Sequence, residues 1–95
     1  MIRREGNRLL LEGAVTVGTV PSLLDAGASH LRDGVEVVDF AAVTEVDSAA
    51  LALALAWLRA AQASGRTLRF ANLPGAMEKL ARLYAVDELL PPARA

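Results

Sequence analysis

Few side chains in this sequence could carry out chemistry, and they do not form a catalytic set. The chain has no cysteine and a single histidine, His30. Catalysis needs a nucleophile beside a base, a bound metal, or a pair of carboxylates in a cleft. His30 stands beside Arg32 and Asp33, near the end of a predicted helix. A lone histidine there is typical of a solvated side chain or a partner of the helix dipole. We therefore predict that the protein is not an enzyme.

Metal and phosphate sites are equally unsupported. Glu45 and Asp47 are two residues apart, but hard cations need several oxygen ligands, so this pair alone makes a poor site. Neither the Gly-x-Gly-x-x-Gly pattern nor the phosphate loop Gly-x-x-x-x-Gly-Lys-Ser/Thr occurs. We predict no metal and no cofactor, and any ATP involved must be bound by a partner protein.

The most informative polar pair is Asp47-Ser48, which follows an apolar strand and precedes a long apolar helix. Either side chain can accept hydrogen bonds from the unpaired amides at a helix start. Helix capping is common and accounts for these residues about as well as a functional role does.

Alternating and helical patterns place these residues in an α/β fold. Strand patterns cover 8–13 with 14–17 (joined at Gly13), 35–40 and 67–71, and helix patterns run from 19–21 to 33, from 47–48 to about 64, and from 74, where Met77, Leu80, Ala81 and Tyr84 are predicted to face inward. A short turn is predicted at 86–90. The predicted order is β-β-α-β-α-β-α, in a mixed sheet of four to five strands with right-handed crossovers. We expect one domain over 1–95, with its core at about 8–90 and loose ends at the first seven and last four residues.

Composition excludes several functional classes. The 95 residues are 54% hydrophobic and carry a net charge of −1, whereas a nucleic-acid binder needs a basic field. The longest apolar run, Ala49 to Leu58, falls short of the about 20 residues that span a membrane. We expect no nucleic-acid partner and no direct membrane insertion.

The helix after Ser48 is apolar on more than one side. Leu51, Leu55 and Leu58 form one stripe, which we predict to face the core. The opposite side carries Ala49, Leu53, Ala56, Trp57 and Ala60. One interpretation is a docking face with Leu53 and Trp57 as anchors, which could also make the isolated domain a weak homodimer. The other is that Trp57 packs against a helix of its own chain.

The strand–loop–helix segment around Asp47-Ser48-Ala49-Ala50-Leu51 resembles the STAS domain of bacterial anti-sigma-factor antagonists and related partner-binding modules. The stretches Val46–Leu55 and Leu80–Val86, with Asn72-Leu73-Pro74, are similar to the STAS subunit of the Mla phospholipid ABC transporter. The resemblance implies a cytoplasmic subunit, peripheral to the inner membrane. It would bind the transporter's ATPase, and through it the permease, in lipid traffic that maintains outer-membrane asymmetry.

One departure separates the two subfamilies. The antagonists usually carry the phosphorylated hydroxyl at the third residue of the loop motif, where this chain has Ala49, whereas Ser48 matches the hydroxyl residue of the transporter subunits. The resemblance implies that Ser48 contacts the ATPase, and we expect its hydroxyl to act as a contact rather than as a phosphate acceptor. The expected partner-binding residues are Asp47, Ser48, Ala49, Leu53, Ala56, Trp57 and Tyr84.

Two other functions stay open. An anti-sigma-factor antagonist, which binds an anti-sigma factor, is the main alternative. A sensor of a small ligand such as a nucleotide or a lipid is the third, although the motifs lack polar groups that would orient a ligand.

Overall fold

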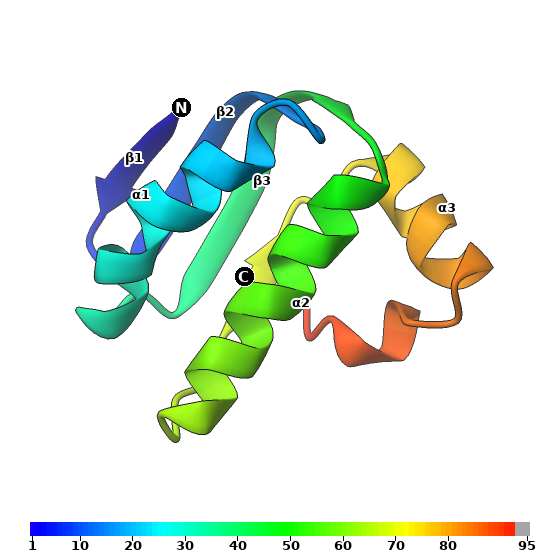
Figure 1. The fold of residues 1–95 in the computed structure, drawn as a ribbon. Helices are drawn as coiled ribbons and strands as arrows, with labels where there is room; N and C mark the ends of the chain where they lie inside the picture. Colours follow the sequence, from blue (N-terminus) through cyan, green and yellow to red (C-terminus); the bar gives the residue numbers. More distant parts are fainter. Residues whose placement is uncertain (93–95) are drawn as a thin grey trace.

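A computed structural model describes residues 1–92 as one sheet with helices packed against it (Figure 1). The elements are β1 (Ile2–Glu5), β2 (Arg8–Val15), α1 (Val20–Arg32), β3 (Val37–Val46), α2 (Ser48–Ala63), β4 (Arg69–Ala71), α3 (Gly75–Leu83) and a 3-10 helix (Asp87–Leu89). This order confirms the predicted β-β-α-β-α-β-α succession. The starts of the three helices and the ends of the first two fall within about two residues of their predicted positions.

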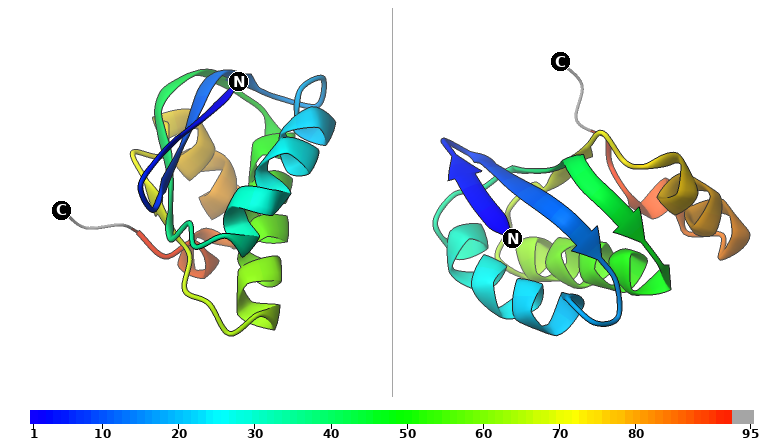
Figure 2. Two further views of the ribbon diagram at one scale, coloured as in Figure 1. Left: turned by 90° about the vertical axis from the view of Figure 1, so that its left-hand side faces the viewer. Right: turned by 90° about the horizontal axis from the view of Figure 1, so that it is seen from above.

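The sheet is mixed and its strands follow one another in chain order, β1-β2-β3-β4. β1 is antiparallel to β2, and the other two pairs are parallel. Both connections between parallel strands contain a helix, and α1 and α2 lie on the same face of the sheet (Figure 2). The hydrophobic core fills the space between that face and the helices. Its largest fully buried side chains are Phe40, Phe70, Leu9, Leu11, Leu53, Leu68, Met77, Val15 and Val38.

The N-terminal segment is ordered, contrary to the expectation that the first seven residues are loose. Ile2–Glu5 pairs with Arg8–Leu11 through a two-residue turn at Gly6-Asn7. Gly6 has φ +62°, a conformation that glycine adopts without steric cost and that tight hairpin turns require. The Gly-Asn dipeptide is itself a hairpin signal. The predicted break at Gly13 is also wrong, because β2 runs through it to Val15 with only local shifts in register.

Two other strands differ from their predicted lengths. β3 continues beyond Phe40 to Val46, because residues 42–46 pair with 12–15 of β2. β4 is only three residues long, but its Phe70 N–H donates to the carbonyl of Pro91 at 2.9 Å, and a bridge joins Phe70 to Pro92. The chain near its C-terminus therefore lies along β4 as a fragment of a fifth strand.

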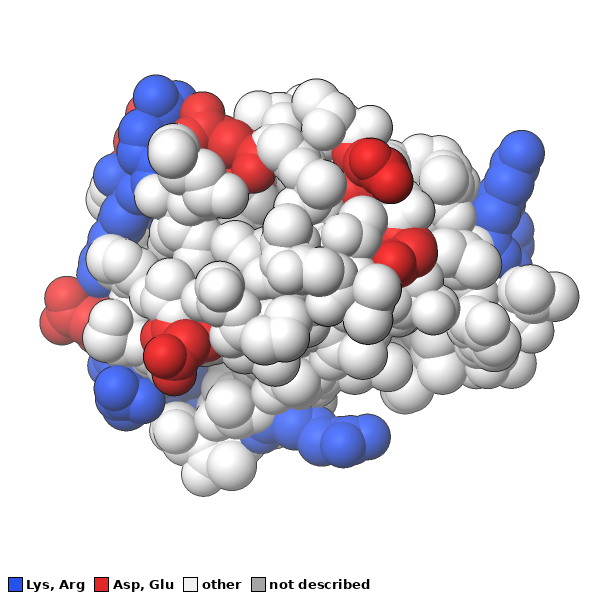
Figure 3. All heavy atoms as spheres, turned by 45° about the horizontal axis from the view of Figure 1, so that its top comes forward, with Lys and Arg blue, Asp and Glu red and all other residues white. Residues whose placement is uncertain are grey.

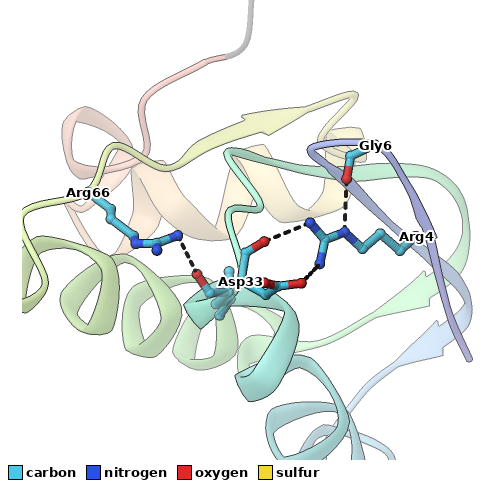
Figure 4. Close-up of polar contacts among 5 residues, drawn as sticks. Arg4, Gly6, Asp33 and Arg66 are labelled. Carbon is cyan, nitrogen blue, oxygen red and sulfur yellow. Dashed lines mark hydrogen bonds and ion pairs between the residues drawn. The ribbon is translucent and has the colours of Figure 1, made fainter.

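Two arginines fix the C-terminal end of α1 (Figure 4). Arg4 donates from Nη1 to Asp33 Oδ2 at 3.0 Å and from Nη2 to the Asp33 carbonyl at 2.7 Å, while its Nε bonds the Gly6 carbonyl at 2.8 Å. Arg66, which follows α2, donates to the Leu31 carbonyl at 3.2 Å. The last carbonyls of a helix lack partners within it, so these bonds satisfy them and place positive charge at the negative end of the helix dipole.

The end of α3 contains a strained residue. Ala85 has φ +57°, and the turn around it is closed by Val86 N–H donating to the Ala81 carbonyl at 2.8 Å. Glycine is the residue that usually occupies this left-handed position after a helix. We expect Ala85→Gly to stabilise the domain by about 1 kcal/mol, because it removes the steric cost of a Cβ at positive φ. Chemical denaturation measures the change.

The matched control applies the same substitution inside the helix. Ala76 is an exposed residue of α3, and Ala76→Gly is expected to destabilise the domain, by up to about 1 kcal/mol. If both substitutions destabilise the protein equally, the proposed strain at Ala85 is wrong.

Candidate partner-binding site

Asp47 organises the edge of the sheet at which the parallel strands end. Its Oδ1 accepts a hydrogen bond from the Ala49 N–H at 2.8 Å, which caps the start of α2. Its Oδ2 accepts from the Val17 N–H, in the loop between β2 and α1, at 3.0 Å. The predicted capping role is confirmed, and the same carboxylate also holds a second loop beside the first turn of α2.

The loop between β2 and α1 is held from its other side by Thr19. The Thr19 hydroxyl accepts from the Thr16 N–H at 3.0 Å and donates to the Ala14 carbonyl at 2.9 Å. These bonds leave the Val17 side chain 76% exposed at the tip of the loop. The sequence pattern placed Val17 in a strand, and Val17 was not among the predicted partner-binding residues. The available signal was Gly18, directly followed by the start of a helix.

Ser48 is the first residue of α2 and is exposed. Its hydroxyl has no hydrogen-bond partner within residues 1–92, whereas both oxygens of the neighbouring Asp47 are bonded. Ala49 is half-buried beside it. The edge of the sheet therefore presents a hydroxyl on a rigid helix start, next to an exposed apolar loop. We call Val17, Ser48 and Ala49 the edge patch.

The prediction that Leu53 and Trp57 are exposed anchors is wrong. Leu53 is 0% and Trp57 3% exposed, because α2 turns both residues toward the sheet and α1. Trp57 lies directly against Gly27 of α1: a Cβ added to Gly27 would be 2.4 Å from Trp57 Cζ2. The interpretation that Trp57 packs against a helix of its own chain is therefore confirmed. Leu55, predicted to face the core with Leu51 and Leu58, is only half-buried.

The residues that α2 does expose are mostly alanines. They are Ala52, Ala56, Ala60 and Ala63, together with Ser48, Arg59 and Gln62. Ala56 is thus accessible, as expected, and lies roughly 12 Å along the helix axis from Ser48. The outer side of α2 has little bulk and a single charge, which would allow another protein to approach the helix closely.

Tyr84 lies apart from the edge patch. It was predicted to face inward, but it follows the last turn of α3 and is 56% exposed. The nine residues of α3 place it roughly 13 Å from the start of that helix. Together with the exposed Leu83, Tyr84 forms a separate apolar spot.

A buried charge cluster lies on the other face of the sheet. Asp39 of β3 is 8% exposed, and its neighbours Val38 and Phe40 point into the core, so the strand's alternation turns Asp39 away from it. Arg8 Nη1 donates to Oδ2 at 2.7 Å, while Oδ1 accepts from Asn72 Nδ2 at 3.0 Å and from the Ala41 N–H at 2.8 Å. Burial raises the pKa of Asp39, but the bonds from Asn72, Ala41 and Arg8 outweigh it and lower the pKa below 3.8.

This cluster was missed from the sequence, although an acid within the apolar strand 35–40 was a signal for it. Asn72 has φ +56° and leads into α3, so Asp39 helps to fix where that helix begins. Its carboxylate is fully engaged by these donors, which indicates a structural role.

The face over the helices and the carboxyl edge of the sheet is largely uncharged (Figure 3). Charged side chains lie mainly around its rim, and only a few acidic groups interrupt the middle. Within residues 1–92, no three potential metal ligands come together, and no helix has the length and apolar character needed to cross a membrane. The surface suits contact with another protein.

Comparisons with known proteins agree with this architecture. Among solved structures, a Thermotoga maritima protein assigned as an anti-sigma factor antagonist has a TM-score of 0.77 at 13% identity, covering 100% of this chain and 86% of that one. SpoIIAA, an anti-sigma factor antagonist solved in its unphosphorylated form, has a TM-score of 0.73 at 14% identity, covering 99% and 87%. An anti-sigma factor antagonist from Mycobacterium paratuberculosis gives 0.71 at 16%, covering 100% and 84%.

At these identities the solved structures establish the fold alone. The comparison with curated proteins found no match. The family model described as "Mlab, STAS domain" matches residues 1–91, nearly the whole chain. Together with the capped helix at Asp47-Ser48 and the strand order, this match confirms the resemblance seen in the sequence: the chain belongs to the STAS domain family.

Proposed function

We propose that this STAS domain is a non-catalytic subunit that binds the ATPase of an Mla-type phospholipid ABC transporter. In this role the protein is cytoplasmic, reaches the inner membrane only through its partner, and supports lipid traffic that maintains outer-membrane asymmetry. Two findings support the proposal: the matching family is described as Mlab, STAS domain, and the helix start carries Ser48 with Ala49 at the following position.

The exposed Ser48 hydroxyl is the observation that carries the proposal. It stands on the first turn of a helix whose start Asp47 holds rigid through two hydrogen bonds. A rigid polar group loses little conformational entropy on binding, which favours its use as a contact. Val17 and Ala49 beside it supply apolar surface. The proposed interface is the edge patch, continued along the outer side of α2 as far as Ala56.

Burial changes the set of residues that can touch a partner. Asp47 acts by positioning Ser48 and the Val17 loop, since both its oxygens are already bonded. Leu53 and Trp57 support the interface from inside the domain. Tyr84 contacts the partner only if that partner also extends over the C-terminal end of α3.

Ser48→Arg is expected to lower retention of the ATPase by at least about tenfold, because a long charged side chain cannot be accommodated at a close-packed contact. The measurement is co-purification of the tagged full chain from its own cells, with the retained proteins identified by mass spectrometry. Circular dichroism and thermal melting confirm that the variant is folded, since arginine at a helix start costs only about 0.3–1 kcal/mol.

Ser29→Arg is the matched control, because Ser29 is an exposed serine of α1 in the half of that helix remote from the edge patch. It is expected to retain the ATPase as the wild type does. Retention of an anti-sigma factor in place of an ABC-type ATPase contradicts the proposal and supports the alternative, an anti-sigma-factor antagonist. Equal retention by both serine variants rejects the edge patch as the interface.

A further inference from the structure

A groove of about 310 Å³ runs between α1 and α2. Ala56 is the one residue that it shares with the proposed ATPase contact. Its apolar walls are formed by Leu24 and Ala28 of α1 and by Ala56, Trp57 and Ala60 of α2. Arg32, Ser64 and Arg66 line it where the two helices end. Ligand sites are usually apolar concavities of about 300–1,000 Å³ with a few polar groups. The groove could not be predicted from the motifs, because its lining comes from two helices and from Arg66, which follows the second of them.

The groove results from the way the helices pack. Gly27 admits the ring of Trp57 between α1 and α2, so the indole forms the inner wall. On the outer side, Ala28, Ala56 and Ala60 have too little volume to close the space above it. The segment of α2 from Ala56 to Ser64 is roughly 12 Å long, which suits an extended chain of about eight to ten carbons.

The charge of the lining selects the kind of ligand. Two arginines line the groove, and no aspartate or glutamate does. Arg66 is held at the mouth by its bond to the Leu31 carbonyl (Figure 4), and a guanidinium has five N–H donors, so most of them stay available. The C-terminal ends of α1 and α2 each carry about half a negative charge, which disfavours an anion. The two full positive charges of the arginines outweigh this effect.

We propose that the groove binds a single-chain fatty carboxylate. The alkyl chain lies along Trp57 between the alanines of the two helices, and the carboxylate pairs with Arg32 and Arg66. Guanidinium groups bind carboxylates through paired, charge-assisted hydrogen bonds. This inference stands on the groove alone and holds whether or not the ATPase is the partner.

The test uses octanoate and the fluorescence of Trp57, the single tryptophan of the chain. Octanoate is expected to change the Trp57 emission saturably, below its micelle concentration. Octanol and octyltrimethylammonium carry the same chain with a neutral and a positive head. We expect them to bind at least about fivefold more weakly, because neither supplies an anion for the two arginines.

Variants locate the site. Arg32→Gln is expected to weaken octanoate binding about fivefold and leave octanol unchanged, and Ala60→Leu, which fills the groove, is expected to abolish binding of both. Arg59→Gln is the matched control, since Arg59 is an exposed arginine of α2 outside the groove, and it should bind octanoate as the wild type does. Equal binding of the cationic amphiphile, or equal losses in Arg32→Gln and Arg59→Gln, overturns the proposal.

Discussion

Gly27→Ala is expected to destabilise the domain by about 2 kcal/mol, although alanine is the better helix former. A Cβ at this position would lie 2.4 Å from Cζ2 and 3.0 Å from Cη2 of Trp57, far closer than carbon atoms can approach. Trp57 is 3% exposed, so either its ring must be displaced from its packed position toward the groove or the two helices must separate. Such overpacking costs typically about 1–3 kcal/mol, and larger values arise when a ring cannot move. The gain of about 1 kcal/mol from helix propensity only partly offsets it.

Chemical denaturation gives the free energy of unfolding, and Trp57 fluorescence in the folded state reports whether the ring has moved. Gly75→Ala is the matched control. Gly75 begins α3 with no atom within 4 Å of an added Cβ, so this change is expected to be neutral or slightly stabilising. If Gly27→Ala is as stable as the wild type, the close packing of Trp57 on α1 is wrong.

Asp39→Ala is expected to destabilise the domain by about 2 kcal/mol, because it leaves Arg8, Asn72 and the Ala41 N–H without their acceptor. A buried group that loses a charged partner costs about 1–3 kcal/mol. Arg8 is partly exposed, so water compensates its share of the loss. Asn72 holds the entry to α3 at positive φ, and its release is expected to loosen that helix as well. Asp25→Asn, at an exposed position of α1, is the control and should change stability by less than about 0.5 kcal/mol.

The contribution of Asp39 is also expected to depend on pH. Its pKa is lower in the folded protein than the ordinary 3.8, so the folded state binds fewer protons than the unfolded state in acid. The stabilisation is therefore complete above the ordinary pKa and is lost as the pH falls through the lower, folded value.

The measurement is the free energy of unfolding from pH 7 to pH 3, for the wild type and for Asp39→Asn. Asparagine keeps the shape of the side chain but carries no charge. The difference between the two proteins should be constant near neutrality and shrink below about pH 4. A difference that stays constant down to pH 3 would show that the charge of Asp39 contributes nothing.

The sequence predicted the elements better than it predicted their faces. Asp47, Pro21 and Pro74 mark the helix starts through local chemistry, so those boundaries could be read directly. Nothing local, however, orients a helix made almost entirely of leucine and alanine. Which side of α2 faces inward is decided by the fit of Trp57 against Gly27, two residues far apart in the chain. The two residues predicted as anchors of a docking face on this helix, Leu53 and Trp57, are therefore buried.

In the candidate site, too, local features could be predicted from the sequence and contacts between distant residues could not. Ser48 at a helix start follows from its neighbours, and the structure exposes it as the resemblance implied. The bond from Val17 to Asp47 joins two connections that only the completed sheet brings together. The pairing of Arg8 with Asp39 across β2 and β3 likewise depends on the register of the strands. A single stretch of sequence can mark one partner of such a contact, as Asp39 does within its apolar strand, but it does not identify the other partner.

The proline pair beside β4 affects how copies of this domain could join. Proline has no N–H to donate, and Pro91 and Pro92 lie along the outer side of β4. An open filament of sheets requires each copy to present two compatible edges. Within residues 1–92, β1 is an edge strand with no strand on its outer side, whereas the two prolines beside β4 offer no N–H donor to a further strand. If two copies joined through β1, their outer sides would each carry a proline pair, which disfavours further growth by strand addition along β4.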